Sequence, residues 1–117
     1  MVLRDLYSLK KGDFITVEWD LNTYHPGLFK KNKMIICFLG GLDRNSEGYH
    51  KGDALFMLDL ANNFRVFQPF GVYTKHNRIR KPTPGELFEL MDAVRVNGYR
   101  YNRKTKKLTK IKATICN

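Results

Sequence analysis

The stretch Lys33-Met-Ile-Ile-Cys-Phe-Leu39 decides how the rest of the chain is interpreted, because apolar side chains fill every position after Lys33. Successive residues of a strand point to opposite faces of a sheet, so a strand that is apolar throughout needs cover on both faces. The pattern therefore predicts a central strand, which Gly40-Gly41 is expected to end or bend. The run is also much shorter than the roughly 20 apolar residues that span a bilayer, which favours a soluble protein with no membrane partner.

A second strand is predicted on the N-terminal side, over Phe14-Ile-Thr-Val-Glu-Trp19, directly after the turn pair Gly12-Asp13. Its alternation predicts one fully covered face and one partly covered face. The two faces are expected to hold Ile15, Val17 and Trp19 on one side and Phe14, Thr16 and Glu18 on the other.

On the C-terminal side, a turn-rich stretch over 20–27 and a long polar loop over 43–53 separate the apolar segments. Two further strands are predicted over Ala54–Leu60 and Phe64–Gln68. Because asparagine tolerates positive φ, Asn62-Asn63 is expected to form the hairpin turn between them.

A helix is predicted from Thr83-Pro-Gly-Glu86, which fits a capping box with proline at the first helical position. Asn97-Gly98 is a suitable C-terminal stop. Apolar residues recur between these ends at helical spacing and are expected to form one buried stripe, with Phe88 beside it. The residues of the stripe are Leu87, Leu90, Met91 and Val94.

The last segments, Tyr99–Asn102 and Lys107–Ile111, are predicted to form a hairpin around Arg103–Lys106. Strands dominate and helical crossovers are absent, which excludes a doubly wound α/β fold. We therefore expect residues 1–117 to form a single, mainly β domain of the α+β type. The two architectures considered are a small SH3-like barrel and a bent antiparallel sheet, each with one C-terminal helix and a terminal β-hairpin.

Composition supports a packed cytoplasmic protein. Apolar residues make up 43% of the chain and aromatic residues 13%, which is enough for a core. Residues 1–7 contain charges where a signal peptide needs apolar residues. Cys37 is expected to be a small buried hydrophobe, and a disulfide with Cys116 is not favoured. The histidines are scattered and no nucleotide-binding fingerprint is present, so no metal site and no cofactor are predicted.

The positive charge is concentrated in the last third of the chain. The formal net charge is +10. Residues 1–74 contain nine Lys/Arg and eight Asp/Glu, whereas residues 75–117 contain twelve Lys/Arg and three Asp/Glu. This asymmetry indicates a surface for an anionic partner, such as nucleic acid, an acidic protein or lipid headgroups. A charged face that serves only solubility is the competing interpretation.

The segment from Thr83 to Leu108 resembles the tail of small uncharacterised proteins from bacteriophages and gut bacteria. In that family a short helix leads into Gly, Tyr, a variable residue, an aromatic residue, Asn or Asp, and then Thr, Lys and Leu. The resemblance implies a phage or mobile-element accessory protein and transfers no catalytic residue. Many relatives have acidic residues where Arg103-Lys104 stand, so a binding role of this hairpin would be peculiar to this chain. The matching positions are Gly98, Tyr99, Tyr101, Asn102, Thr105, Lys106 and Leu108.

The basic and tyrosine side chains of the C-terminal part are the candidate site of a non-enzymatic binding module. Lysine and arginine neutralise phosphates, and tyrosine rings stack on exposed bases at about 1–3 kcal/mol per base. Nucleic acid is therefore the favoured partner. Sequence specificity is expected to be low, because the helix commits its apolar stripe to the core. The candidate residues are Arg78, Arg80, Lys81, Tyr99, Arg100, Tyr101, Arg103, Lys104, Lys106, Lys107 and Lys110.

Three alternatives remain open at this point. Tyr99 and Tyr101 share one face of the hairpin and are equally suited to anchoring it against the helix. The basic face is also suited to binding and modulating an acidic host protein. The least supported alternative is an enzyme that uses Glu18, Asp20 or His25 as acid or base.

Overall fold

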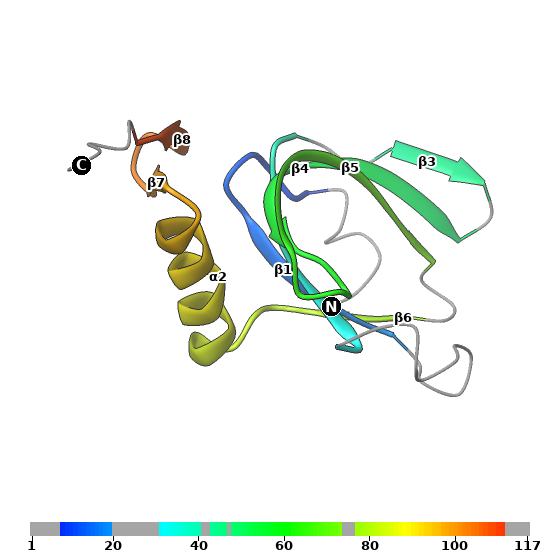
Figure 1. Cartoon of the computed structure of the whole chain (residues 1–117). Coiled ribbons are helices and arrows are strands. Elements are labelled where there is room, and N and C mark those ends of the chain that lie inside the picture. The colour runs from blue at the N-terminus through cyan, green and yellow to red at the C-terminus, as the bar shows by residue number, and fades with distance from the viewer. Residues whose placement is uncertain (1–7, 20–30, 41–42, 47, 74–76, 112–117) are drawn as a thin grey trace.

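A curved antiparallel sheet forms the centre of the fold (Figure 1). The computed structural model describes residues 8–19, 31–40, 43–46, 48–73 and 77–111. The strands of the sheet lie in the order β3-β4-β2-β1-β6, and β5 pairs with β4. The elements are β1 (Phe14–Trp19), β2 (Lys33–Phe38), β3 (Asp43–Ser46), β4 (Tyr49–Leu58), β5 (Phe64–Tyr73), β6 (Asn77–Arg80), α2 (Pro84–Val96), β7 (Tyr99–Asn102) and β8 (Lys107–Lys110).

β2 lies in the middle of the sheet, as its apolar sequence predicted. It pairs with β1 along one edge and with β4 along the other. All of its residues after Lys33 are buried. Ile36 and Phe38 enter a core cluster on one face of the sheet, and Ile35 and Cys37 enter a cluster on the other face. Cover on both faces explains why no residue of this strand after Lys33 is polar.

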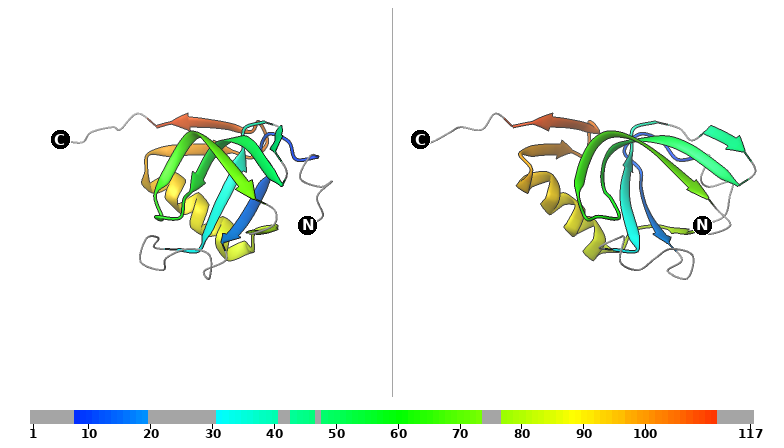
Figure 2. Two further views of the ribbon diagram at one scale, coloured as in Figure 1. Left: turned by 90° about the vertical axis from the view of Figure 1, so that its right-hand side faces the viewer. Right: turned by 45° about the vertical axis from the view of Figure 1, so that its right-hand side comes forward.

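The sheet does not close into a barrel within the described residues, so the bent sheet is correct and the closed SH3-like barrel is wrong. A closed barrel needs a ladder between its end strands, and no such ladder joins β5 to β6 in this part of the chain. The sheet instead curls over one face (Figure 2). Phe70 and Val72 of β5 thereby join the same cluster as Ile15 and Val17 of β1.

The prediction of a long loop over 43–53 is wrong. β3 pairs with β4, and β4 begins at Tyr49 instead of Ala54. β5 is also longer than predicted and pairs with β4 as far as Tyr73. Strand formation depends on cross-strand neighbours more than on intrinsic propensity, so pairing along both edges keeps these polar residues extended.

The predicted turn between β4 and β5 is confirmed at Asn62, which has a φ of 64°. The Asp59 side chain stabilises this turn, accepting from the backbone N–H groups of Ala61 at 2.9 Å and Asn63 at 2.8 Å. The turn-rich stretch predicted over 20–27 lies outside the described residues.

The predicted capping box of α2 is confirmed. The Glu86 backbone N–H donates to the Thr83 hydroxyl at 3.2 Å, and the Thr83 N–H donates to the Glu86 carboxylate at 2.8 Å. Gly98 follows the helix with a φ of 82°, the left-handed conformation that commonly ends helices.

α2 and the β7–β8 hairpin cover the second face of the sheet (Figure 1). Leu90 and Val94 of the predicted stripe are buried, and Met91 packs against the same cluster. Phe88 is 74% exposed and takes no part in this packing. The hairpin is thus held against the sheet at the C-terminal end of the helix.

Candidate nucleic-acid interface

The β7–β8 hairpin is anchored to the sheet by its own aromatic residues. Tyr99, Tyr101 and Leu108 pack against the core cluster beneath α2. The centre of the Tyr101 ring lies 4.9 Å from that of Phe56 and 6.2 Å from that of Phe14. These contacts agree with the interpretation of the two tyrosines as anchors of the hairpin.

A buried thiol lies beneath the hairpin. Cys37 is fully buried, as predicted, and its thiol is the hydrogen-bond partner of the Tyr101 hydroxyl. Burial raises the pKa of the Cys37 thiol to about 12, and burial also raises the pKa of the Tyr101 hydroxyl. Both groups are therefore neutral at pH 7 and orient the tyrosine ring without adding charge. Cys116 lies outside the described residues.

The register of the hairpin directs two cations away from the sheet. Tyr101 pairs with Leu108 on the inner face, so the neighbouring pairs Arg100–Thr109 and Asn102–Lys107 lie on the outer face. Arg100 and Lys107 are exposed there. Lys110 is also exposed, opposite Tyr99 at the end of the hairpin distant from its turn.

The turn of the hairpin meets the turn that precedes β1. Gly12 has a φ of 90°, and a Cβ at this position would lie 2.7 Å from the Cδ of Lys106. Only glycine suits both conditions. The contact brings the exposed Lys10 and Lys11 to the same end of the molecule as the basic hairpin turn. Sequence reasoning missed these two lysines, because acidic residues balance the charge of the first 74 residues.

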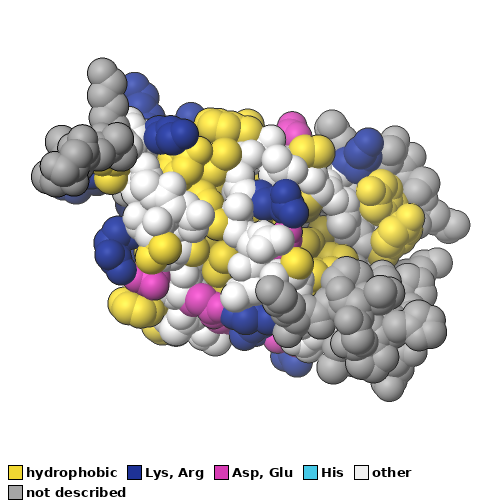
Figure 3. Space-filling view, in the orientation of Figure 1, with side chains coloured by type: hydrophobic (Ala, Val, Ile, Leu, Met, Phe, Trp, Pro, Cys, Tyr) yellow, Lys and Arg dark blue, Asp and Glu magenta, His cyan; other side chains and the backbone are white. Residues whose placement is uncertain are grey.

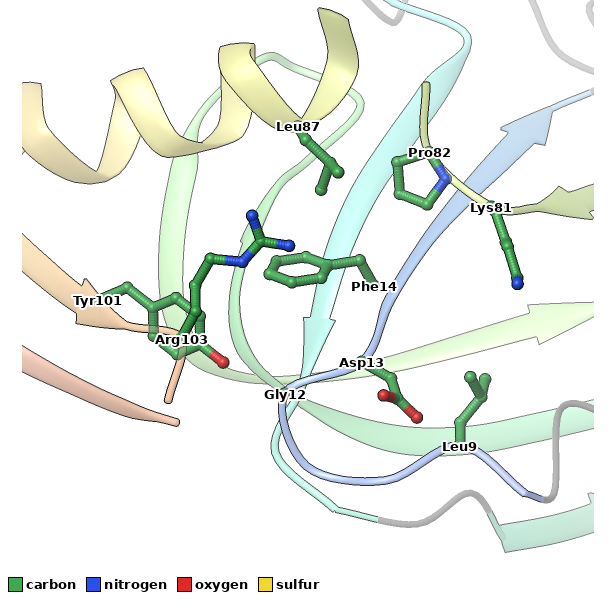
Figure 4. A pocket seen from close by; sticks show the side chains of 9 residues that line it. All are labelled: Leu9, Gly12, Asp13, Phe14, Lys81, Pro82, Leu87, Tyr101 and Arg103. Carbon is green, nitrogen blue, oxygen red and sulfur yellow. The ribbon is translucent and has the colours of Figure 1, made fainter. Parts of the chain in front are cut away.

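A pocket of about 500 Å³ lies between these two turns and the start of α2 (Figure 4). The carbon of the Arg103 guanidinium lies 5.5 Å from the centre of the Phe14 ring, within the range of a cation–π interaction. Apolar side chains from three segments of the chain line the pocket together with this ring, and the charged lining consists of two cations and one carboxylate. The lining residues are Leu9, Gly12, Asp13, Phe14, Lys81, Pro82, Leu87, Tyr101 and Arg103.

Two exposed cations line this pocket, and four more contact its lining residues or are their neighbours in the chain. In the described part of the chain, none of them is ion-paired with a carboxylate. Figure 3 shows dark blue side chains near the hairpin with no magenta side chain next to them, whereas several others on this face lie beside magenta carboxylates. We term this set the basic rim, and it consists of Lys10, Lys11, Lys81, Arg103, Lys104 and Lys106.

Five of the predicted cations are not part of the basic rim: Arg100, Lys107 and Lys110 lie elsewhere on the hairpin, and Arg78 and Arg80 lie on β6. Arg80 is ion-paired with Glu18 at 2.6 Å and with Glu86 at 2.7 Å, so its charge is balanced inside the protein. Arg78 lies opposite Glu18 in the β1–β6 ladder. Glu18 is four residues along β1 from Phe14, roughly 13 Å in an extended strand. The structure therefore places Lys81 at the pocket, keeps Arg78 away from it, and commits the charge of Arg80 to Glu18 and Glu86.

Glu86 is the centre of a buried ion network that the sequence did not reveal. Its carboxylate accepts from the Arg80 guanidinium at 2.7 and 2.8 Å, from Lys33 Nζ at 2.7 Å and from the Thr16 hydroxyl at 3.2 Å. The side chain is only 5% exposed. The network ties the first turn of α2 to β1, β2 and β6. The capping box predicted only the contact with Thr83.

The same network predicts how stability depends on pH. The Arg80 guanidinium, helped by Lys33, outweighs burial and holds the pKa of the Glu86 carboxyl well below its usual range. The unfolded chain, with an ordinary glutamate pKa of about 4.3, therefore binds this proton more readily than the folded protein. Stability from Glu86 is present in full above about pH 5 and is lost progressively as the pH falls through 4 and below. Urea unfolding from pH 7 to pH 3 should show this loss.

The control for that titration is Glu86→Gln, which removes the titrating group. The difference in unfolding free energy between wild type and variant should shrink as the pH falls, because other carboxylates contribute equally to both proteins. A difference that stays constant down to pH 3 would contradict the assignment.

Among the described residues, no arrangement of acidic and basic side chains supports the enzyme alternative. Glu18 accepts from Arg80 Nε at 2.7 Å and is thereby committed to an ion pair. Asp20 and His25 lie outside the described residues. Within the described ranges, no group of three or more His, Cys, Asp or Glu is placed to hold a metal ion.

The fold and the site define a class of small β protein. Its bent antiparallel sheet is covered by one helix and a basic hairpin, and an aromatic pocket with cations at its rim lies between the helix, the hairpin and the turn before β1. Among the described residues, no helix has both the length and the apolar composition needed to cross a membrane. Comparison with protein-family models, with curated proteins and with solved structures finds no match to this chain. The resemblance of the C-terminal segment to phage and gut-bacterial proteins stays a prediction, and function is argued from the site alone.

Proposed function

We propose that this protein binds single-stranded nucleic acid through the basic rim, with low sequence specificity and without catalysing a reaction. The observation that supports this proposal is the position of six exposed cations, none ion-paired within the described residues, around an aromatic pocket. Lysine and arginine that are free of carboxylate partners neutralise phosphates and release the counterions condensed on the strand.

The arrangement of α2 supports a single strand over duplex DNA. Reading the major groove requires a helix or ribbon with an accessible recognition face. Leu90 and Val94 of α2 are buried against the sheet, so the apolar stripe of the helix is committed to the core. Contact through the rim and through aromatic rings is the mode that single strands use.

Neutralising two rim lysines is expected to weaken the salt dependence of oligonucleotide binding. Lys104→Gln with Lys106→Gln removes two charges and keeps most of the Lys106 stem, which packs over Gly12. Each lost phosphate contact lowers the slope of log K against log salt by about 0.7 for a single strand, so the pair lowers it by about 1.4. Fluorescence anisotropy with a labelled 12-nucleotide strand, at several salt concentrations, measures this slope.

The matched control is Lys51→Gln with Arg78→Gln, which removes two exposed cations outside the rim, neither of them ion-paired within the described residues, and gives the same net charge. It should leave the slope nearly unchanged. Equal losses in both double variants would mean that the strand contacts positive charge over the whole surface. If the affinity of the wild type for the oligonucleotide did not depend on salt concentration, the proposal would be overturned. If the protein bound polyglutamate tightly and did not bind oligonucleotides, its partner would be an acidic protein surface.

A further inference from the structure

We infer that the pocket beside Phe14 takes one unpaired base of the bound strand, of the kind that bears an exocyclic amine. The inference deepens the proposed function and rests on it, because the basic rim must first hold the strand. The pocket volume of about 500 Å³ is within the range of about 300–1,000 Å³ found for small-molecule sites.

Phe14 provides a fixed surface on which a base can stack. Its ring makes edge contacts with Tyr101 and Phe56, with ring centres 6.2 and 6.4 Å apart, and these contacts hold it in place. Arg103 lies over the same ring at 5.5 Å and is itself exposed, so a base that stacks on the ring requires the guanidinium to move outward, where it can cover the base. Figure 4 shows the Phe14 ring between the Arg103 guanidinium and Pro82.

The charged groups of the pocket distinguish between bases. The Asp13 carboxylate only accepts hydrogen bonds, whereas Lys81 and Arg103 only donate them. Cytosine presents an amine donor next to a ring nitrogen and a carbonyl that accept, which matches both kinds of group. Thymine has a carbonyl oxygen in place of that amine, and the carboxylate would repel it.

Asp13 is placed to accept from a base without losing its structural contact. Its Oδ2 accepts from the Lys10 backbone N–H at 2.7 Å, which orients the carboxylate. An ionised carboxylate has about four acceptor sites, so this bond leaves capacity for a ligand. Another pocket, about 240 Å³ at the C-terminal end of α2, is lined by Glu89 and Asp92 and by no lysine or arginine, so it does not offer both donors and acceptors to a base.

The test compares labelled dC12 with dT12 by anisotropy, since the two strands have equal charge and closely similar stacking area. Wild type is expected to bind dC12 about fivefold more tightly than dT12. Asp13→Asn keeps an acceptor for the Lys10 N–H but also presents a donor, so it should abolish the preference. Phe14→Leu should weaken binding of dC12 about tenfold while leaving the salt slope unchanged.

The control for Phe14→Leu is Phe64→Leu, an aromatic residue of the same cluster that does not line the pocket. It should bind like wild type, and thermal unfolding should confirm that every variant is folded. Equal affinity for dC12 and dT12 with a normal salt slope would overturn the inference and leave the proposed function standing. If the protein bound neither strand, the inference and the proposed function would both be overturned. Competition by free dCMP at the same concentration as dC12 would show that the pocket is a nucleotide site and not a site for a strand.

Discussion

Replacing Glu86 by glutamine is expected to lower the free energy of unfolding by about 3 kcal/mol at pH 7. The carboxylate is 5% exposed and accepts from Arg80, Lys33 and Thr16. Removing one partner of a buried ion network leaves the opposite charges uncompensated, which typically costs about 3–5 kcal/mol. Arg80 keeps its ion pair with Glu18, so the expected loss lies at the lower end of that range. Urea unfolding followed by circular dichroism measures it.

Glu89→Gln is the matched control, since Glu89 lies one turn further along the same helix and pairs with Lys31. Both of those side chains are about one-third exposed, and such pairs contribute little. The control should therefore cost at most about 0.5 kcal/mol. A loss below about 1 kcal/mol for Glu86→Gln, or similar losses in the two variants, would mean that the network does not hold α2 against the sheet.

Elements with a strong local signal could be predicted from the sequence. The central position of β2 follows from an apolar run that needs cover on both faces. The start of α2 follows from a capping box within four consecutive residues, and the β4–β5 turn follows from an asparagine that tolerates positive φ. In each case the residues that decide the structure are neighbours in the chain.

Features that depend on distant residues could not be predicted. The early start of β4 at Tyr49 requires pairing with β3 and β5, which no local pattern in that polar segment indicates. Arg80 was predicted as a binding residue because its sequence neighbours are basic, yet its partners Glu18 and Glu86 reach it only through the folded sheet and helix.

The pocket, too, depends on residues that are distant in the sequence. Lys10 and Lys11 join the basic hairpin only because the turn at Gly12 packs against Lys106, a contact between segments more than 90 residues apart. Charge counted along the sequence located four of the six cations of the basic rim and missed Lys10 and Lys11. An aromatic residue at the start of a strand, such as Phe14, gives no signal in the sequence that it will form the wall of a pocket.

Replacing Phe56 by alanine is expected to lower the free energy of unfolding by about 4 kcal/mol, the largest effect of any substitution considered. Phe56 is fully buried, and deleting a buried phenylalanine side chain typically costs about 3–5 kcal/mol because a cavity remains. Its ring contacts Tyr101, Phe14 and Phe64, with ring centres 4.9, 6.4 and 6.1 Å apart. Thermal and urea unfolding measure the loss.

The control is Phe88→Ala, which removes the same side chain at a position that is 74% exposed and should change stability by less than about 0.5 kcal/mol. Phe56→Leu keeps most of the buried volume and serves if the alanine variant does not fold. Because Phe56 supports both the ring that lines the pocket and the tyrosine that anchors the hairpin, Phe56→Leu should also reduce the dC12 preference. A Phe56→Leu protein with reduced stability but an unchanged preference would mean that the pocket does not depend on the core beneath it.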